Sequence, residues 1–284
     1  MEGTSTSENV SAHGPPVWWK RVLRSAGLAA ALLLLLGAGF VVFLEESFIY
    51  FPAKGGVGPS PGEEVALTAS DGVRLHGWYV SHPKARHTIL WFHGNAGNIE
   101  YRRDRLSELR ELPASVLVID YRGYGKSDGA PTEQGLGLDA RAAYDWLCSR
   151  TTPERIVLLG KSLGAGPACE LASQVPVGGL IVQSAFTSAP DMAPLVMPLF
   201  PARWFMRTKF DNLSKVARIS CPKLFVHSRD DEIIPFRMGE ALHAAAAAPK
   251  ECAWFDGAGH NDLWVTHSKA YSSRLAAFLE RLEK

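Results

Sequence analysis

The sequence predicts an α/β fold built on a mostly parallel β-sheet. Three observations predict it: short apolar runs alternate with helical patterns, the apolar runs are nearly continuous, and the chain is long enough for one large domain. A continuous apolar run indicates a strand that is buried on both faces, as in the middle of a parallel sheet. With 284 residues, of which 46% are hydrophobic, the chain can fill one large core and still carry an appendage.

Eight strands and five helices are expected over residues 63–284. Residues 70–72 (Ser-Asp-Gly) are a hairpin signal between the first two strands. The strands are expected at 64–68, 73–80, 88–92, 116–120, 156–160, 179–183, 223–227 and 251–255. The helices are expected at 99–111, 133–149, 163–173, 238–247 and 263–282.

An insertion at about 186–215 separates two of these strands. We expect it to form a short cap over the carboxyl ends of the strands, where ligands bind in sheets of this class. Its methionine and aromatic side chains could line a pocket or form a small separate core.

The first 62 residues differ in composition from the rest. Residues 1–24 are rich in small polar residues and end in a basic cluster, which is typical of a disordered tail. Residues 25–44 carry no charge, and as a helix rising about 1.5 Å per residue they would cross the roughly 30 Å hydrocarbon layer. They are therefore expected to be a transmembrane signal anchor, with a cleaved signal peptide as the alternative. Residues 45–62 are expected to form a linker.

The charges that flank the apolar segment predict its orientation. Lys20, Arg21 and Arg24 precede it, and Glu45 and Glu46 follow it. Because basic residues stay on the cytoplasmic side, we expect a single-pass protein with a cytoplasmic N-terminus and the large domain on the other side of the membrane.

Composition and motifs exclude several functions. A net charge of +1 without a clustered basic face argues against nucleic-acid binding. No zinc-binding H-E-x-x-H, phosphate-binding loop or dinucleotide fingerprint is found, so neither a metal nor a cofactor is expected.

The most informative motif is Gly160-Lys161-Ser162-Leu163-Gly164. It lies between an expected strand and an expected helix, with Ser162 at the apex of the turn. A sharp, strained turn that lifts a serine hydroxyl clear of a sheet leaves no room for side chains two residues on either side. The pattern therefore predicts a nucleophile elbow and covalent hydrolysis.

An acid and a histidine follow the serine at the ends of two later strands. The acid is Asp230 or Asp231, after the strand at 223–227, and the histidine is His260, in a glycine-containing loop. The order Ser, Asp, His is the one found in α/β-hydrolases and differs from the orders in chymotrypsin-like and subtilisin-like proteases.

With these motifs the chain resembles the α/β-hydrolase superfamily, and within it the Bem46 and ABHD13- and ABHD17-like serine hydrolases. The resemblance covers about residues 63–284 and implies an eight-stranded α/β-hydrolase fold. The phrases that carry it, in the same order, are 93–98, 120–127, 160–164, 184–188, 231–235 and 259–262.

The resemblance also implies roles for individual residues. Ser162 would be the nucleophile and His260 the general base. The acid would be Asp231 rather than Asp230. Backbone N–H groups of Asn95 and Leu163 would form the oxyanion hole. The residues expected to support the site structurally are His93, Gly94, Gly160 and Gly164.

The sequence thus predicts a membrane-anchored serine hydrolase. Its expected substrates are small-molecule or acylated esters or thioesters, with lipids among the candidates. The sequence does not identify protein partners. A serine peptidase or amidase of the same fold is the alternative within the same chemistry. A tethered binding scaffold without turnover is a third hypothesis.

Overall fold

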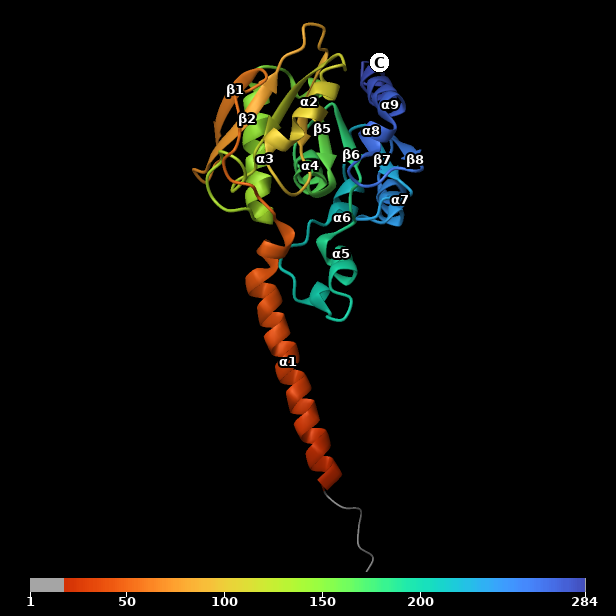
Figure 1. Cartoon of the computed structure of the whole chain (residues 1–284). Helices are drawn as coiled ribbons and strands as arrows, with labels where there is room; N and C mark the ends of the chain where they lie inside the picture. Colours follow the sequence, from red (N-terminus) through yellow and green to blue (C-terminus); the bar gives the residue numbers. More distant parts are fainter. Residues whose placement is uncertain (1–17, 284) are drawn as a thin grey trace, which may run out of the picture.

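The computed structural model describes residues 18–283 and contains the predicted sheet (Figure 1). Eight strands form one sheet in the order β1-β2-β4-β3-β5-β6-β7-β8. The two pairs that involve β2 are antiparallel and all the others are parallel. The strands are β1 (Glu63–Thr68), β2 (Arg74–Val80), β3 (His87–Phe92), β4 (Ala114–Ile119), β5 (Ile156–Lys161), β6 (Gly179–Gln183), β7 (Lys223–Ser228) and β8 (Lys250–Phe255). The predicted fold class is confirmed.

Helices cover both faces of the sheet, which explains the continuous apolar runs. Every residue of β3, β4, β6 and β7 is buried, whereas the edge strand β8 is only partly buried. One face is covered by α3 (Glu133–Cys148), α4 (Ala165–Ala172), α6 (Asn212–Val216) and α7 (Phe236–Ala245). The other is covered by α2 (Arg103–Leu109), α8 (Leu263–Thr266) and α9 (Ser268–Arg281).

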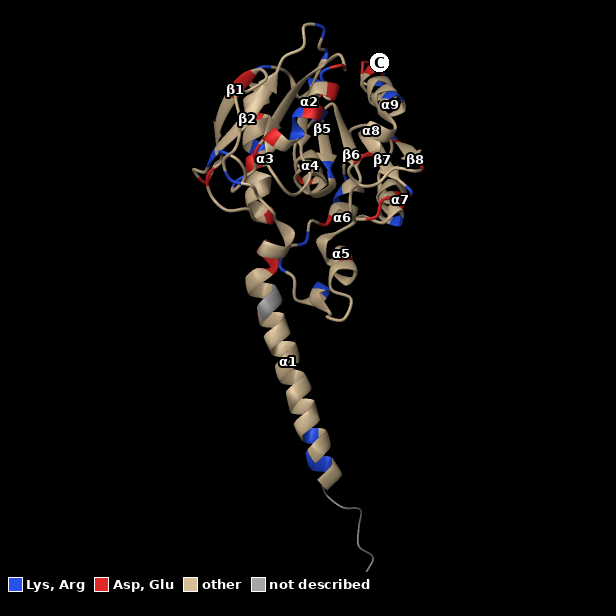
Figure 2. Cartoon of the chain, viewed as in Figure 1, with Lys and Arg blue, Asp and Glu red and all other residues tan. Residues whose placement is uncertain are grey.

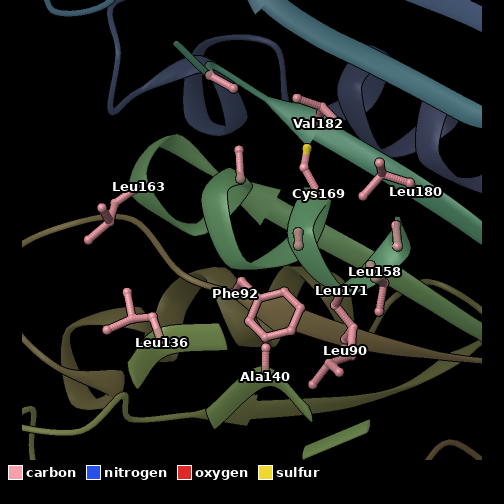
Figure 3. Close-up of a cluster of buried hydrophobic side chains, with 14 of the residues drawn as sticks. Leu90, Phe92, Leu136, Ala140, Leu158, Leu163, Cys169, Leu171, Leu180 and Val182 are labelled. Atoms are coloured by element: carbon pink, nitrogen blue, oxygen red, sulfur yellow. The ribbon is translucent and has the colours of Figure 1, made fainter. Parts of the chain in front are cut away.

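The core on the α3 and α4 face packs against the segment that carries the predicted elbow, residues 160–164. Figure 3 shows Leu90 and Phe92 of β3 with Leu158 of β5, and Leu171 of α4 lies among them. All four are at most 2% exposed. Burial of these side chains fixes α4 against the sheet, and therefore fixes the turn that leads into α4.

Three predicted helices differ in detail from the observed ones. The segment expected at 99–111 begins as a 3-10 turn, η1 (Ile99–Arg102), and the one expected at 163–173 begins as η3 (Ser162–Gly164). The segment expected at 263–282 is interrupted at His267, which separates α8 from α9. A further 3-10 turn, η2 (Pro153–Arg155), precedes β5.

The N-terminal helix α1 (Trp18–Ile49) is longer at both ends than the expected span of 25–44. Of the tail expected at 1–24, residues 1–17 lie outside the described part of the chain, and residues 18–24 are helical. The linker expected at 45–62 is helical up to Ile49. The physical reason is that neither flank contains glycine or proline, so the helix continues by adding one hydrogen bond per residue.

Residues Trp18–Gly39 of α1 are long and apolar enough to cross a membrane, and none of this stretch is buried by the rest of the chain. Figure 2 shows basic residues at the start of α1 and acidic residues where it reaches the domain. α1 projects from the domain on the side where the insertion between β6 and β7 lies (Figure 1).

We call the insertion between β6 and β7, for which a cap was predicted, the cap. It contains α5 (Ala189–Val196) and η4 (Ala202–Trp204), and it leads into α6. Ala193 and Ala202 form a small core of their own with four surrounding side chains, namely Met197, Phe200, Phe205 and Met206.

Candidate active site

The turn around Ser162 has the strained geometry that its sequence predicts. Ser162 has a φ of +53°, a left-handed conformation that is rare outside glycine. A Cβ atom on Gly160 would lie 2.7 Å from the Cα of Ala165, and one on Gly164 would overlap the carbonyl group of Phe92. Both flanking glycines are therefore required by close backbone approach. The turn presents Ser162 at the carboxyl end of β5.

Ser162, His260 and Asp231 form a continuous hydrogen-bonded chain. The Ser162 Oγ lies 3.1 Å from His260 Nε2. On the other side of the ring, His260 Nδ1 lies 2.8 Å from an Asp231 carboxylate oxygen. His260 and Asp231 are 5% and 7% exposed, so the contact between them is buried, whereas the Ser162 contact lies at the cavity. The three groups come from the loops after β5, β7 and β8.

The environment of Asp231 keeps its carboxyl group ionised. Its second oxygen accepts backbone N–H bonds from Ile233 at 3.0 Å and Ile234 at 2.7 Å. His227 Nε2 lies 3.2 Å from the oxygen that faces His260. Burial raises the pKa of Asp231, but hydrogen bonds from His227 and His260 outweigh it, so the pKa lies well below its ordinary value.

Asp230, the alternative acid, has a different partner. Its carboxylate accepts the backbone N–H of Gly257 at 2.6 Å, in the loop that carries His260. Glu232 accepts the backbone N–H of His260 at 2.9 Å. Of these three acidic residues, only Asp231 bonds to the imidazole ring of His260. Asp230 and Glu232 bond instead to the backbone of the loop that carries the ring.

The loop after β3 lies against Ser162. A Cβ atom on Gly94 would be 3.5 Å from the Cβ of Ser162, an ordinary contact distance. Arg102 Nη2 lies 3.3, 3.1 and 2.5 Å from the carbonyl oxygens of Gly94, Asn95 and Ala96. Because one guanidinium group binds three successive carbonyl groups, their peptide N–H groups face away from it. No sequence signal identified this arginine, which occupies an ordinary position in a helical pattern.

His93 is fully buried behind this loop. Its Nδ1 donates to the Gly94 carbonyl at 2.8 Å, and the Tyr121 hydroxyl donates to the His93 carbonyl at 2.8 Å. Burial first, and then the charge of Arg102, lower the pKa of His93 to about 4. A neutral, buried ring of this kind braces the loop and has no path to exchange protons with a substrate.

Leu163 is the second residue of η3, the 3-10 turn that begins at Ser162. Backbone N–H groups at the start of a helical segment have no acceptor within the segment. Ser162, Leu163 and the loop residues Gly94 and Asn95 all line one cavity, so the residues predicted as nucleophile and oxyanion donors lie around the same space.

Comparison with known proteins shows the family to which the chain belongs. The family model described as alpha/beta hydrolase fold matches residues 87–206. An uncharacterized Mycobacterium tuberculosis protein, Rv2307c, is 36% identical over 262 residues, which cover 88% of this chain and 93% of that protein. The Arabidopsis thaliana alpha/beta hydrolase domain-containing protein WAV2 is 33% identical and covers 88% of this chain and 92% of its own length. The chain belongs to the α/β-hydrolase fold family.

Solved structures show the same fold for this α/β hydrolase. The Pyrococcus furiosus esterase Pf2001 superposes with a TM-score of 0.68 at 23% identity and covers 81% of this chain and 98% of its own. An esterase from Exiguobacterium antarcticum superposes with a TM-score of 0.58 at 20% identity and covers 77% of this chain and 100% of its own.

A segment that the sequence predicted as linker is bonded to the Asn95 side chain of this α/β hydrolase. We call residues 49–55 the strap. The Asn95 amide nitrogen donates to the carbonyl of Ile49, and its oxygen accepts the N–H of Phe51 at 3.1 Å. The same oxygen accepts the Tyr124 hydroxyl at 3.0 Å. The strap thus connects the end of α1 directly to the loop that faces Ser162.

The strap makes a second set of bonds with Gly97 and Asn98, further along the same loop. Asn98 Nδ2 donates to the carbonyl groups of Ala53 at 3.2 Å and Gly55 at 2.8 Å. The N–H of Gly97 donates to the carbonyl of Phe51 at 3.2 Å. The sequence did not indicate that the strap binds this loop, because glycine-rich segments are also typical of flexible linkers.

A cavity of about 420 Å³ extends from Ser162 between the cap and α1. Most of its walls are apolar, which suits a hydrophobic substrate group. Apolar side chains that line it come from the cap (Met192, Val196, Met197 and Met206) and from the end of α1 and the strap (Phe48, Ile49 and Phe51). Among the described residues, no group of His, Cys, Asp and Glu is arranged to hold a metal ion.

Lys161 and Arg102 add positive charge to the cavity wall. Lys161 Nζ donates to the side-chain oxygen of Asn261, next to His260, at 2.9 Å. Burial, followed by the charges of Arg102 and Arg105, lowers the pKa of Lys161 to about 8. The Lys161 side chain therefore lies against the cavity, next to the loop that carries His260.

Proposed function

We propose that this α/β hydrolase is a membrane-anchored serine hydrolase that cleaves carboxylic esters or thioesters through an acyl-enzyme. The observation that carries the proposal is the hydrogen-bonded chain Ser162–His260–Asp231 at the end of an apolar cavity. A serine nucleophile, a base within hydrogen-bond reach and an acid that orients the base form the group that nucleophilic catalysis needs.

Each member of the chain has one role in the proposed reaction. Ser162 Oγ attacks the carbonyl carbon while His260 Nε2 accepts its proton, and Asp231 holds the tautomer with the proton on Nδ1 and stabilises the imidazolium. Collapse of the tetrahedral intermediate releases the alcohol or thiol, which takes the proton from His260. Water then attacks the acyl-enzyme while His260 again accepts a proton. The proton returns to Ser162 as the carboxylic acid is released.

The negative oxygen of the intermediate would be bound by the backbone N–H groups of Asn95 and Leu163. These donors belong to segments that other contacts hold rigidly, so little reorganisation is needed during the reaction. Loss of one such donor typically lowers turnover by about 10²–10³-fold.

Two observations favour esters over amides. The cavity wall is largely apolar, as expected for an acyl group, and the solved structures of similar fold cited above are named as esterases. The same residues could also cleave amides, so a peptidase or amidase is the alternative that the experiment must address.

The anchor in this proposal is α1. Its first 22 residues, Trp18–Gly39, are apolar enough to cross a membrane and none of them is buried, and basic residues cluster at its N-terminal end. The positive-inside rule then places the N-terminus in the cytoplasm and the catalytic domain on the other side of the membrane. Protease treatment of sealed vesicles tests this orientation: digestion of the domain only after lysis of vesicles with the cell-surface side outward would contradict it.

The activity is tested with the full chain in detergent micelles. The full chain is treated with a fluorophosphonate probe and with p-nitrophenyl esters from acetate to palmitate, together with matched acyl p-nitroanilides. Ser162→Ala should abolish labelling and turnover, whereas Ser173→Ala, at the far end of α4, should retain both. Faster cleavage of the anilides than of the esters would favour the amidase. A folded protein without labelling would contradict the proposal and favour a binding scaffold.

A further inference from the structure

The tip of the cap is unusually apolar for an exposed segment. Residues 192–202 form eleven consecutive positions without a polar side chain, between Asp191 and Arg203. Several large side chains at the tip are exposed: Leu195 by 44%, Val196 by 64%, Leu199 by 100% and Trp204 by 78%. A contiguous exposed apolar patch of this kind marks a surface that is covered by a partner or by lipid.

The tip lies beside the apolar part of α1. A side chain at Gly37 would overlap the ring of Phe200, so the ring packs directly on the helix backbone. Figure 1 shows α5 and the loop after it extending from the domain along α1. Gly37 precedes Leu44, the last residue of the uncharged segment, by seven residues, or about 10 Å along the helix.

A second contact fixes the cap to α1 nearer the domain. Glu45 is only 4% exposed, and its carboxylate accepts the backbone N–H groups of Arg207 at 2.9 Å and Thr208 at 3.0 Å. It also accepts the Thr208 hydroxyl at 2.9 Å. Because the cap is attached to α1 at two levels, the depth of the helix in a membrane determines the depth of the cap.

We propose that the cap tip, residues 195–204, inserts into the membrane leaflet from which α1 emerges. This inference rests on the membrane anchoring in the proposed function. If residues 25–44 span the hydrocarbon layer, Phe200 lies at the depth of Gly37, inside that layer. The tip is suited to this place because it has no charge between Asp191 and Arg203, and a long Arg203 side chain can extend toward the headgroups. In Figure 2 the lower part of the cap is uncharged except for one basic position.

The inserted cap also determines how substrate arrives. Met192, Val196 and Met197 of the cap line the cavity opposite Phe48 and Ile49 of α1. Val196 lines the cavity and is also 64% exposed, so the cavity is open to its surroundings at this side chain. An acyl chain can therefore pass from the leaflet to Ser162 between the cap and α1 without crossing water. The substrate class that follows is an acyl ester that resides in the leaflet.

Depth-dependent quenching tests the insertion. The full chain with Cys148, Cys221 and Cys252 replaced by Ser is reconstituted in phosphatidylcholine vesicles that contain doxyl-labelled lipid, and one fluorophore is attached through Leu199→Cys. Matched variants carry the fluorophore through Leu33→Cys, in the apolar part of α1, or through Lys84→Cys, an exposed position between β2 and β3. We expect quenching at positions 33 and 199 and none at position 84.

The outcomes separate this inference from the proposal on which it rests. Quenching at position 33 without quenching at position 199 would leave the anchor in place and overturn the insertion of the cap. No quenching at either position would overturn the anchor and, with it, the insertion. Fluorophore self-quenching at position 199 in vesicles without doxyl lipid, with no effect of added doxyl lipid, would show that a second copy covers the tip instead.

Kinetics provide a second test. Leu199 and Trp204 do not line the cavity, so the double variant Leu199→Glu/Trp204→Glu should leave turnover of a soluble short-chain ester unchanged. It should raise KM for a long-chain ester embedded in the vesicles by about tenfold or more, because two apolar anchors are lost. Equal effects on both esters would refute the proposed route. Absence of turnover of either ester in the unmodified chain would refute the hydrolase without changing the quenching result.

Discussion

From the bonds between the Asn95 side chain and the strap, we predict that Asn95→Ala will impair turnover more than substrate binding. In the intact protein the Asn95 oxygen accepts bonds from Phe51 at 3.1 Å, Tyr124 at 3.0 Å and Ala96 at 2.8 Å, and its nitrogen donates to Ile49. The alanine variant removes all of them. At about 1 kcal/mol for each hydrogen bond, we expect a loss of about 3–4 kcal/mol in the free energy of unfolding.

The same loss frees the peptide N–H that we propose binds the oxyanion. This donor would bind the negative oxygen only in the transition state and not in the bound substrate. Its displacement should therefore lower kcat while KM for a short ester stays nearly constant. The complete loss of one donor sets an upper limit of about 10²–10³-fold on the effect. Because Arg102 still binds the loop carbonyls, we expect a decrease of about tenfold to a hundredfold.

Asn98→Ala is the matched control. Asn98 also bonds to the strap, through the carbonyl groups of Ala53 and Gly55, but it does not line the cavity. Thermal unfolding and steady-state kinetics of both variants would be measured at the same ester concentrations. Asn98→Ala should lower Tm and retain kcat. If the two variants lose kcat in equal proportion, or if Asn95→Ala retains it, the strap does not position the oxyanion donor.

Three further predictions follow from individual contacts. Gly164→Ala should lower the free energy of urea unfolding by about 2–3 kcal/mol, because its Cβ would overlap Phe92, whereas Gly94→Ala should change it by about 0.5 kcal/mol or less. Lys161→Met should raise Tm at pH 7 and lose most of that gain by pH 10. Burial lowers the pKa of Lys161 to about 8, which means that the folded state is destabilised by the charged form of this side chain. Above that pKa the side chain is neutral in the folded protein, so by pH 10 its replacement relieves little destabilisation. Glu45→Ala should make the cap sensitive to limited proteolysis, since it leaves three donors unpaired, two of them on buried Thr208, and an unchanged digestion pattern would contradict this.

Much of the fold could be predicted because local sequence and tertiary burial agree. Strands such as β3 and β7 are buried on both faces, and this burial imposes the continuous apolar runs that identified them. The elbow was predictable for a similar reason, since contacts within a few residues and with β3 exclude side chains at Gly160 and Gly164. These constraints are local and leave a mark on the sequence.

Long-range contacts leave no such mark. Arg102 binds the loop that faces Ser162, yet in the sequence it is one of several arginines in an exposed helical pattern. No sequence pattern linked His227 to Asp231, and its position 3.2 Å from that carboxylate depends on how the loop after β7 folds back. A side chain whose role depends on a distant backbone carbonyl or carboxylate can be found only when both partners have coordinates.

The contacts of residues 45–55 define where the folded domain begins. Glu45 and Tyr50 are 4% and 3% exposed, and Tyr50 belongs to the main core. Removal of this segment would therefore expose a core side chain, leave the cap donors at Arg207 and Thr208 unpaired and release the loop that faces Ser162. If the apolar segment acts as a cleaved signal peptide rather than as an anchor, cleavage that preserves this site must occur before Glu45. The N-terminal mass of the mature protein tests the point: a mature chain that begins after Phe51 and retains full turnover would contradict a structural role for the strap. In either case the segment after α1 belongs to the catalytic domain.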